Sequence, residues 1–98
     1  MSASVALFSE LELTARRLIE EYRTARGADI FLTEVALLNV WTASWSSALP
    51  VDQIVRVGEA LNNCSLGTNV PKALTMMVRA KLLRSFVSRG VRYYEVNF

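Results

Sequence analysis

Along most of the chain, hydrophobic residues recur every three or four positions, which is the period of an amphipathic helix. This pattern predicts helices over residues 6–26, about 33–45 and about 50–62. We expect Thr33 to cap the second helix and Pro50 to lie in the first turn of the third. A chain of 98 residues is large enough for a single modest hydrophobic core.

The segment 68–81 is predicted to form a fourth helix whose two sides differ strongly. One side is an apolar stripe, along which Val70, Leu74, Met77 and Lys81 recur at spacings of four, three and four with Val78 beside them. The other side is polar and cationic, contains no acid, and carries Thr68, Asn69, Lys72, Thr75, Met76 and Arg79. Thr68 or Asn69 can cap the first free N–H groups, and Pro71 is tolerated only in a first turn. Such a helix can enter the major groove of DNA, although a solvated surface that binds nothing has the same pattern.

Beyond Leu82 the hydrophobic period changes from that of a helix to that of a strand. Residues 82–87 and 92–98 are rich in strand-forming side chains, and the intervening residues 88–91 contain a glycine suited to a turn. We therefore expect a β-hairpin with Arg89 and Arg92 at its tip. The connector 46–49 has room for one or two residues of a further strand.

Three helices, a turn, a fourth helix and a hairpin follow one another in the order of a winged helix-turn-helix. The predicted fold class is α+β, mostly α, with an added N-terminal helix and a C-terminal β-hairpin wing. A length of 98 residues fits a single domain, 1–98. Within it, residues 6–26 would be the N-terminal, dimerising helix and residues 33–98 the winged-helix core.

The first helix is expected to join two copies of the chain. A seam close to a heptad repeat is formed by Phe8, Leu11, Ala15, Leu18 and Tyr22. Leu7, Leu13 and Ile19 widen the apolar surface beyond that seam. The helix therefore has hydrophobic residues for two contacts, one with its own domain and one with a second copy. A helix that only covers its own core is the alternative.

The residue content excludes several classes of protein. With no histidine and one cysteine, Cys64, the chain cannot build a Ser–His or Cys–His catalytic pair, and a zinc site is not expected. We predict no enzyme activity, no catalytic or metal-binding residues and no cofactor. No apolar run approaches the roughly 18 residues of a membrane span, and the N-terminus lacks a secretory signal pattern. Together with the lone cysteine, these features predict a cytoplasmic protein that does not bind membranes.

The net charge of +2 conceals an uneven distribution. Residues 1–50 hold four arginines against six acids, which gives −2, whereas residues 51–98 hold seven cations against three acids, which gives +4. The basic half contains the predicted fourth helix and the hairpin. A clustered positive field of this kind favours a polyanionic partner, although small basic domains also occur for solubility alone.

Residues from about 33 to 96 resemble the DNA-binding core of the multiple-antibiotic-resistance regulator (MarR) family. The resemblance lies in Leu32–Leu38 at the entry to the second helix, in Val70–Met77 of the fourth helix, and in Leu82-Leu83-Arg84 followed by Arg89–Val96 in the hairpin. It implies a regulator that reads the major groove with helix 68–81 and the minor groove with an arginine of the 84–98 hairpin.

The chain departs from the family pattern in three places. Lys81 stands where a glycine usually precedes the apolar pair, and the usual Asp-Arg pair of the wing is absent. The sequence also stops at Phe98, before the C-terminal helices that often form the family's dimer interface. Because family members often bind a small ligand beside those helices, we do not expect a small-molecule effector.

Pattern, charge and resemblance together predict a sequence-specific double-stranded DNA-binding transcriptional regulator that acts as a homodimeric repressor. The residues expected to contact DNA are Thr68, Asn69, Lys72, Thr75, Arg79, Lys81, Arg84, Arg89 and Arg92. The alternative is a winged-helix protein–protein interaction module that does not bind DNA. It would use the apolar surface of the first helix together with Trp41 and Trp45.

Overall fold

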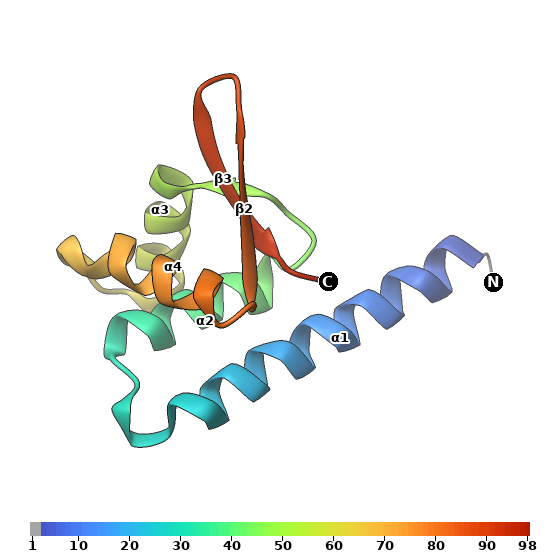
Figure 1. Ribbon diagram of the computed structural model, residues 1–98, viewed down its shortest axis with the longest axis horizontal. Helices are drawn as coiled ribbons and strands as arrows, with labels where there is room; N and C mark the ends of the chain where they lie inside the picture. The colour runs from blue at the N-terminus through green and yellow to red at the C-terminus, as the bar shows by residue number, and fades with distance from the viewer. Residues whose placement is uncertain (1–2) are drawn as a thin grey trace.

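The computed structural model describes the backbone of residues 3–98 and the side chains of residues 7–98. The elements, in chain order, are α1 (Ala3–Arg26), the 3-10 turn η1 (Gly27–Asp29), α2 (Leu32–Ala43), β1 (Leu49–Pro50), α3 (Val51–Asn62), the 3-10 turn η2 (Gly67–Asn69), α4 (Val70–Arg79), β2 (Leu83–Ser88) and β3 (Val91–Val96). Helices predominate, and a small antiparallel sheet lies near the C-terminal end (Figure 1). The predicted α+β class, mostly α, is confirmed. No helix in the described range combines the length and hydrophobicity needed to cross a membrane.

The sheet has three strands in the order β1-β3-β2, and both pairs are antiparallel. The short strand β1 follows the connector 46–49 and places Leu49 opposite Tyr94. Between β2 and β3, Arg89 and Gly90 both have positive φ, 52° and 78°. Two such residues in succession form the two-residue turn whose twist matches the flanking strands. The predicted hairpin is confirmed, and its turn is tighter than the four residues expected.

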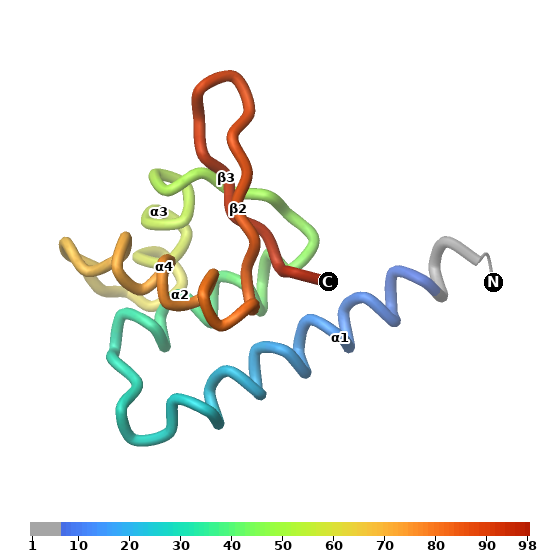
Figure 2. The backbone as a smooth tube through the Cα atoms, viewed as in Figure 1, coloured from blue at the N-terminus to red at the C-terminus, as the bar shows by residue number. Residues whose placement is uncertain are grey.

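The core lies where the four α-helices and the base of the hairpin meet. Its largest fully buried side chains come from α2, α3, α4 and the two hairpin strands: Trp41, Leu37, Leu38, Ile54, Leu74, Met77, Leu83 and Val96. In α3, Gly58 allows a close approach, because a Cβ there would lie 2.7 Å from Leu66 Cδ1 and 3.3 Å from Val40 Cγ2. Figure 2 shows the chain turning back after α1, so that this long helix runs along one side of the domain.

The helix starts differ from those expected from the sequence. Helix α2 begins at Leu32 and ends at Ala43, and the cap position belongs to Phe31 instead of Thr33. The phenylalanine side chain cannot accept a hydrogen bond, and the Glu34 carboxylate accepts the Phe31 N–H at 2.8 Å. Glu34 therefore replaces the side-chain cap expected from Thr33.

Pro50 precedes α3 as its cap residue instead of lying in the first turn.

The fourth helix is shorter than the predicted segment 68–81. Residues 67–69 form the 3-10 turn η2, and Asn69 occupies the cap position without a side-chain capping bond. At the other end, Lys81 has a positive φ of 63°. The Lys81 N–H donates to the Val78 carbonyl at 3.0 Å, and the Leu82 N–H donates to the Met77 carbonyl at 3.0 Å. This pair of bonds is the Schellman arrangement, which ends a helix with a left-handed residue, usually glycine.

A buried carboxylate joins α1 to α2. Glu34 is completely buried, and its Oε1 accepts hydrogen bonds from the Tyr22 hydroxyl at 2.6 Å and from Arg26 Nε at 2.7 Å. Its Oε2 accepts from Arg26 Nη2 at 3.1 Å. Burial by itself would raise the pKa of Glu34, but the hydrogen bonds from Arg26, Tyr22 and the Phe31 amide outweigh it and hold that pKa below its usual value. Burial and the bond to Glu34 raise the pKa of Tyr22, which favours the protonated hydroxyl that donates to Glu34.

Replacing Glu34 with glutamine should lower the free energy of unfolding by about 2–4 kcal/mol, because the charged acceptor shared by three donors is lost. The lowered pKa sets the pH dependence. In the wild type, the contribution of Glu34 is present above its unfolded-state pKa of about 4.3 and disappears as the pH falls through the lower folded-state pKa. Urea unfolding followed by circular dichroism between neutral pH and pH 3 measures both effects.

Tyr22→Phe is the matched control for this prediction, since it removes one donor and should cost about 1 kcal/mol. If the loss of stability at low pH is equally steep in Glu34→Gln and in the wild type, Glu34 is not its source.

Candidate nucleic-acid interface

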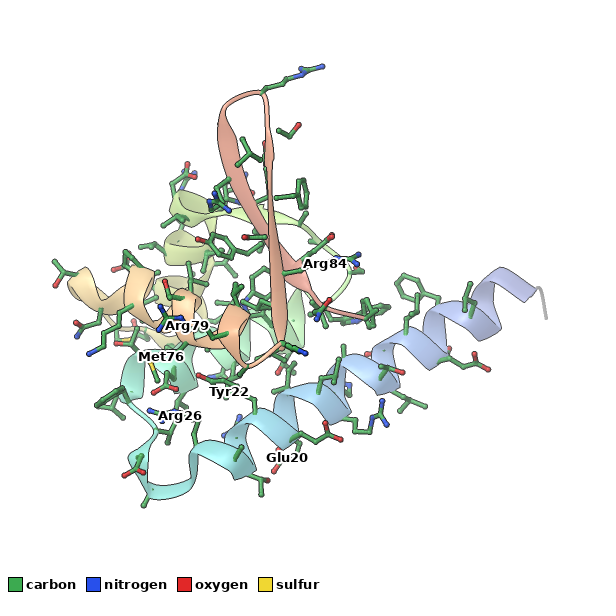
Figure 3. The ribbon with its side chains drawn as sticks, in the orientation of Figure 1. Glu20, Tyr22, Arg26, Met76, Arg79 and Arg84 are labelled. Carbon is green, nitrogen blue, oxygen red and sulfur yellow. The ribbon has the colours of Figure 1, made fainter. Side chains whose placement is uncertain are left out.

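The polar side of α4 is open to solvent. Five of the residues expected to face DNA are exposed along it and its preceding turn: Thr68, Asn69, Lys72, Thr75 and Arg79. The opposite side of the helix, with Val70, Ala73, Leu74 and Met77, is buried. Met76 is half-buried at the margin (Figure 3). The described part of the chain therefore leaves uncovered the α4 surface that the sequence assigned to DNA.

The turn before α4 fixes this helix relative to α3. Asn63 ends α3 in the left-handed conformation, with φ 50°. Leu66 is buried against Gly58, and its N–H donates to Glu59 Oε2 at 3.1 Å. These contacts join the end of α3 to the start of η2, and they hold in place the turn that precedes α4. The sequence suggested a turn here but gave no indication that Glu59 would cap it.

The hairpin separates its arginines. Arg89 lies in the turn at the tip. Arg92 is opposite Val87 and shares a face with the buried residues of the hairpin, and its Nη1 donates to Ser85 Oγ at 2.9 Å. Arg84 lies on the other face, where its Nε is 2.7 Å from Glu95 Oε1 in an ion pair. Successive residues of a strand point to opposite faces, and in this register Arg84 and Arg92 lie on opposite faces of the hairpin.

Lys81 lies at the end of α4 that is distant from Asn69. It borders a hollow between α1 and the α4–β2 turn, whose other lining residues are Leu18, Glu21, Tyr22, Ala25, Ala80 and Leu82. A ten-residue helix is about 15 Å long, so Lys81 and Asn69 mark the two ends of the α4 surface. Thr68, Asn69, Lys72, Thr75 and Arg79 are brought together, whereas Lys81 and the hairpin arginines lie at the periphery.

Two residues beside this surface were missed by the sequence analysis. Phe31 and Leu32, at the start of α2, are 55% and 88% exposed. With Thr33, Glu34, Asn69, Lys72, Ala73 and Met76 they line a hollow of about 480 Å³ between α2 and α4. The Lys72 ammonium lies 5.9 Å from the centroid of the Phe31 ring, and the Arg26 guanidinium lies 5.7 Å from it. A consecutive apolar pair just before a helix is the signal that could have indicated an exposed contact here.

The seam expected to form the dimer interface faces the chain's own core. Ala15 and Tyr22 are buried there, and Leu11 and Leu18 pack against it. Phe8 remains 54% exposed, but its ring contacts that of Trp45, with centroids 4.6 Å apart. The alternative for this helix, that the seam covers its own domain, therefore describes most of these residues. A second copy would need a different side of α1.

No metal-binding group of three or more Cys, Asp or Glu side chains occurs within the described residues. Cys64 is exposed in the turn between α3 and α4. No protein-family model matches this chain, and no curated protein or solved structure matches it.

Proposed function

We propose that this protein is a winged-helix, MarR-type regulator that binds double-stranded DNA in a sequence-specific way, as a dimeric repressor. The observation that carries the proposal is the exposed, acid-free face of α4, which is followed in the chain by a hairpin with an arginine at its tip. The order α2, β1, α3, α4, β2, β3 with sheet order β1-β3-β2 supports the winged-helix assignment, because β1 ties the hairpin to the helices.

In this proposal α4 enters the major groove. The Asn69 side chain makes no capping bond to the helix and can pair with an adenine edge. Lys72 and Arg79 can meet guanine edges or phosphates, and Thr75 can accept a bond although its hydroxyl donates to the Pro71 carbonyl. The buried opposite side holds the helix rigid, which is needed for base recognition.

The hairpin would contact the flanking minor groove or its phosphates. Arg89 at the tip and Arg92 on the helix-facing side are suited to this, since narrow minor grooves attract arginine. Arg84 is held by Glu95 on the other face and would contribute less. The three hairpin arginines are therefore expected to differ in their contributions, although the sequence treated them alike.

A protein-interaction module is the second candidate. Trp41 and Trp45, which the sequence analysis assigned to its contact surface, are buried, and the exposure of Phe31 and Leu32 favours it instead. Apolar side chains beside a cationic surface suit an acidic, amphipathic peptide. A gel-shift with genomic fragments separates the two functions, because only a DNA binder retards the duplex.

Binding to duplex DNA should weaken steeply as salt is added. Each phosphate neutralised by a lysine or arginine releases counterions, and the logarithm of the binding constant falls by about 0.9 per phosphate for each unit of log salt concentration. Fluorescence anisotropy with labelled duplex at several salt concentrations gives the slope. A slope near zero would contradict the proposed contacts.

Arg89→Ala with Arg92→Ala should lower affinity at least roughly tenfold at moderate salt and reduce the salt slope by about 1–2, since two phosphate-facing cations are lost. Arg16→Ala with Arg56→Ala removes the same charge from exposed positions on α1 and α3 and is the matched control. Equal affinities for the two double variants would mean that the hairpin is not a DNA-binding wing.

Lys81→Gly should raise the stability of the protein and lower its affinity for DNA. Glycine adopts a positive φ without strain, so the free energy of unfolding should rise by about 0.5–1 kcal/mol. DNA affinity should fall, because a cation expected to contact the DNA phosphates is removed. Thermal unfolding and anisotropy are measured on the same preparation, and a stabilised variant with unchanged affinity would exclude Lys81 from the interface.

A further inference from the structure

The hollow between α2 and α4 borders the polar face of α4, but much of its lining is apolar. Its residues come from the start of α2 and from α4 with its cap: Phe31, Leu32, Thr33 and Glu34, and Asn69, Lys72, Ala73 and Met76. The last four are related as i, i+3, i+4 and i+7, so they form one stripe along α4. Asn69 and Lys72 belong both to this hollow and to the proposed DNA-binding surface. A ligand that covers these two residues therefore also covers the mouth of the hollow.

Two large hydrophobic side chains are exposed on the α2 side of the hollow. Leu32 is 88% exposed, the highest value among the large hydrophobic residues that the structure describes, and Phe31 is 55% exposed. Met76 is half-buried on the α4 side, and Figure 3 shows it on the side of α4 turned toward Arg26. Exposed apolar side chains gathered around one hollow are typical of a contact site.

Phe31 is held in place, and the charge that the hollow offers to a ligand is positive. The Phe31 N–H donates to Glu34 Oε2 at 2.8 Å, and the Phe31 ring lies 5.7 Å from the Arg26 guanidinium and 5.9 Å from the Lys72 ammonium. Glu34 is the one acid among the lining residues. Its carboxylate is completely buried and accepts the hydrogen bonds described above. The exposed charged group at the hollow is therefore that of Lys72.

Double-stranded DNA presents one apolar group on its base edges in the major groove. The other groups there are hydrogen-bond donors and acceptors, whereas thymine adds a methyl group at C5. Apolar side chains beside a recognition helix complement this methyl group. A lysine at the margin of the same hollow suits the phosphates that flank the base.

We propose that this hollow contacts the C5-methyl groups of thymines in the DNA bound by α4, with Leu32, Phe31 and Met76 as the contacting side chains. The inference rests on the proposed DNA-binding function and adds to it a preference for thymine that the polar side chains of α4 do not supply. It also gives the start of α2 a part in base recognition. Leu32 contributes most, because it is the most exposed of the three.

Removal of the methyl group tests this contact. A duplex is first selected by the protein from a random pool, and each thymine in it is then replaced in turn by deoxyuridine, which lacks only the C5-methyl group. Replacement of a thymine that contacts the hollow should weaken binding about fourfold, which is the effect of burying one such carbon group. The dependence of affinity on salt should stay the same, because no phosphate contact is lost. Fluorescence anisotropy measures both quantities.

Leu32→Gln shows whether the hollow is the source of the effect. In this variant the thymine and uracil duplexes should differ less than about twofold at the same position, because the methyl group has already lost its main apolar contact. Leu13→Gln makes the same change at a position on α1 that is 68% exposed, and should keep the fourfold difference. Circular dichroism verifies that both variants are folded.

A loss that is confined to particular thymines in the wild type and in Leu13→Gln, and that disappears in Leu32→Gln, supports the inference. If the selected duplex contains no thymine, or binds equally well with uracil at every position, the inference is wrong and the proposed DNA binding stands without it. A loss that persists in Leu32→Gln also overturns it, because the methyl group then contacts another part of the protein. If no duplex is selected, both proposals fail, and the hollow is left to the acidic peptide of the second candidate function.

Discussion

The arrangement of this molecule depends on one buried carboxylate. Glu34 takes hydrogen bonds from Tyr22 and Arg26 of α1 and from the backbone of Phe31, so a single side chain joins the long helix to the start of α2. A buried charge of this kind is stable only when its acceptor positions are filled, and three donors from two segments fill them. The bond to Tyr22 adds to the burial of Ala15 and Ile19 in holding that side of α1 against the domain. The bond to Phe31 holds the start of α2 in place, and the Phe31 ring lies 5.9 Å from the Lys72 ammonium on the proposed DNA-binding surface.

The sequence predicted the elements well because their hydrophobic periods are local. It could not predict which of two apolar sides of α1 is buried, since Leu13 and Ile19 both look like core residues until the position of α2 is known. The structure leaves Leu13 exposed and buries Ile19. The hydrogen bonds of Glu34 were not predicted, because its partners Tyr22 and Arg26 lie in another helix and leave no signal in the local pattern.

In the candidate site, too, the features with a local pattern were predicted and those that depend on pairing between strands were not. The exposed side of α4 follows from a period of 3.6 residues and was predicted from it, including Lys72, Thr75 and Arg79. The separation of Arg84 from Arg92 depends on the register of the hairpin, in which Arg84 is opposite Glu95 and Arg92 is opposite Val87. Register is determined by the two-residue turn at Arg89 and Gly90, and a turn of three residues would instead place Arg84 and Arg92 on the same face. Charge alone could not show which of these arginines is expected to contribute most to DNA binding.

At two positions the backbone has a conformation that does not suit the residue found there. Left-handed residues are normally glycine or asparagine, and Gly27, Asn63, Gly67 and Gly90 follow that rule. Lys81 and Arg89 do not, although their φ values of 63° and 52° lie in the same region. Both are exposed cations, one at the end of α4 and one at the tip of the hairpin. A lysine or arginine with a positive φ lowers the stability of the protein, and a glycine at the same position would restore it. Such strain is most often retained where the side chain has a function. Both strained positions carry an exposed cation, and this adds to the support that the acid-free face of α4 gives to a polyanionic partner.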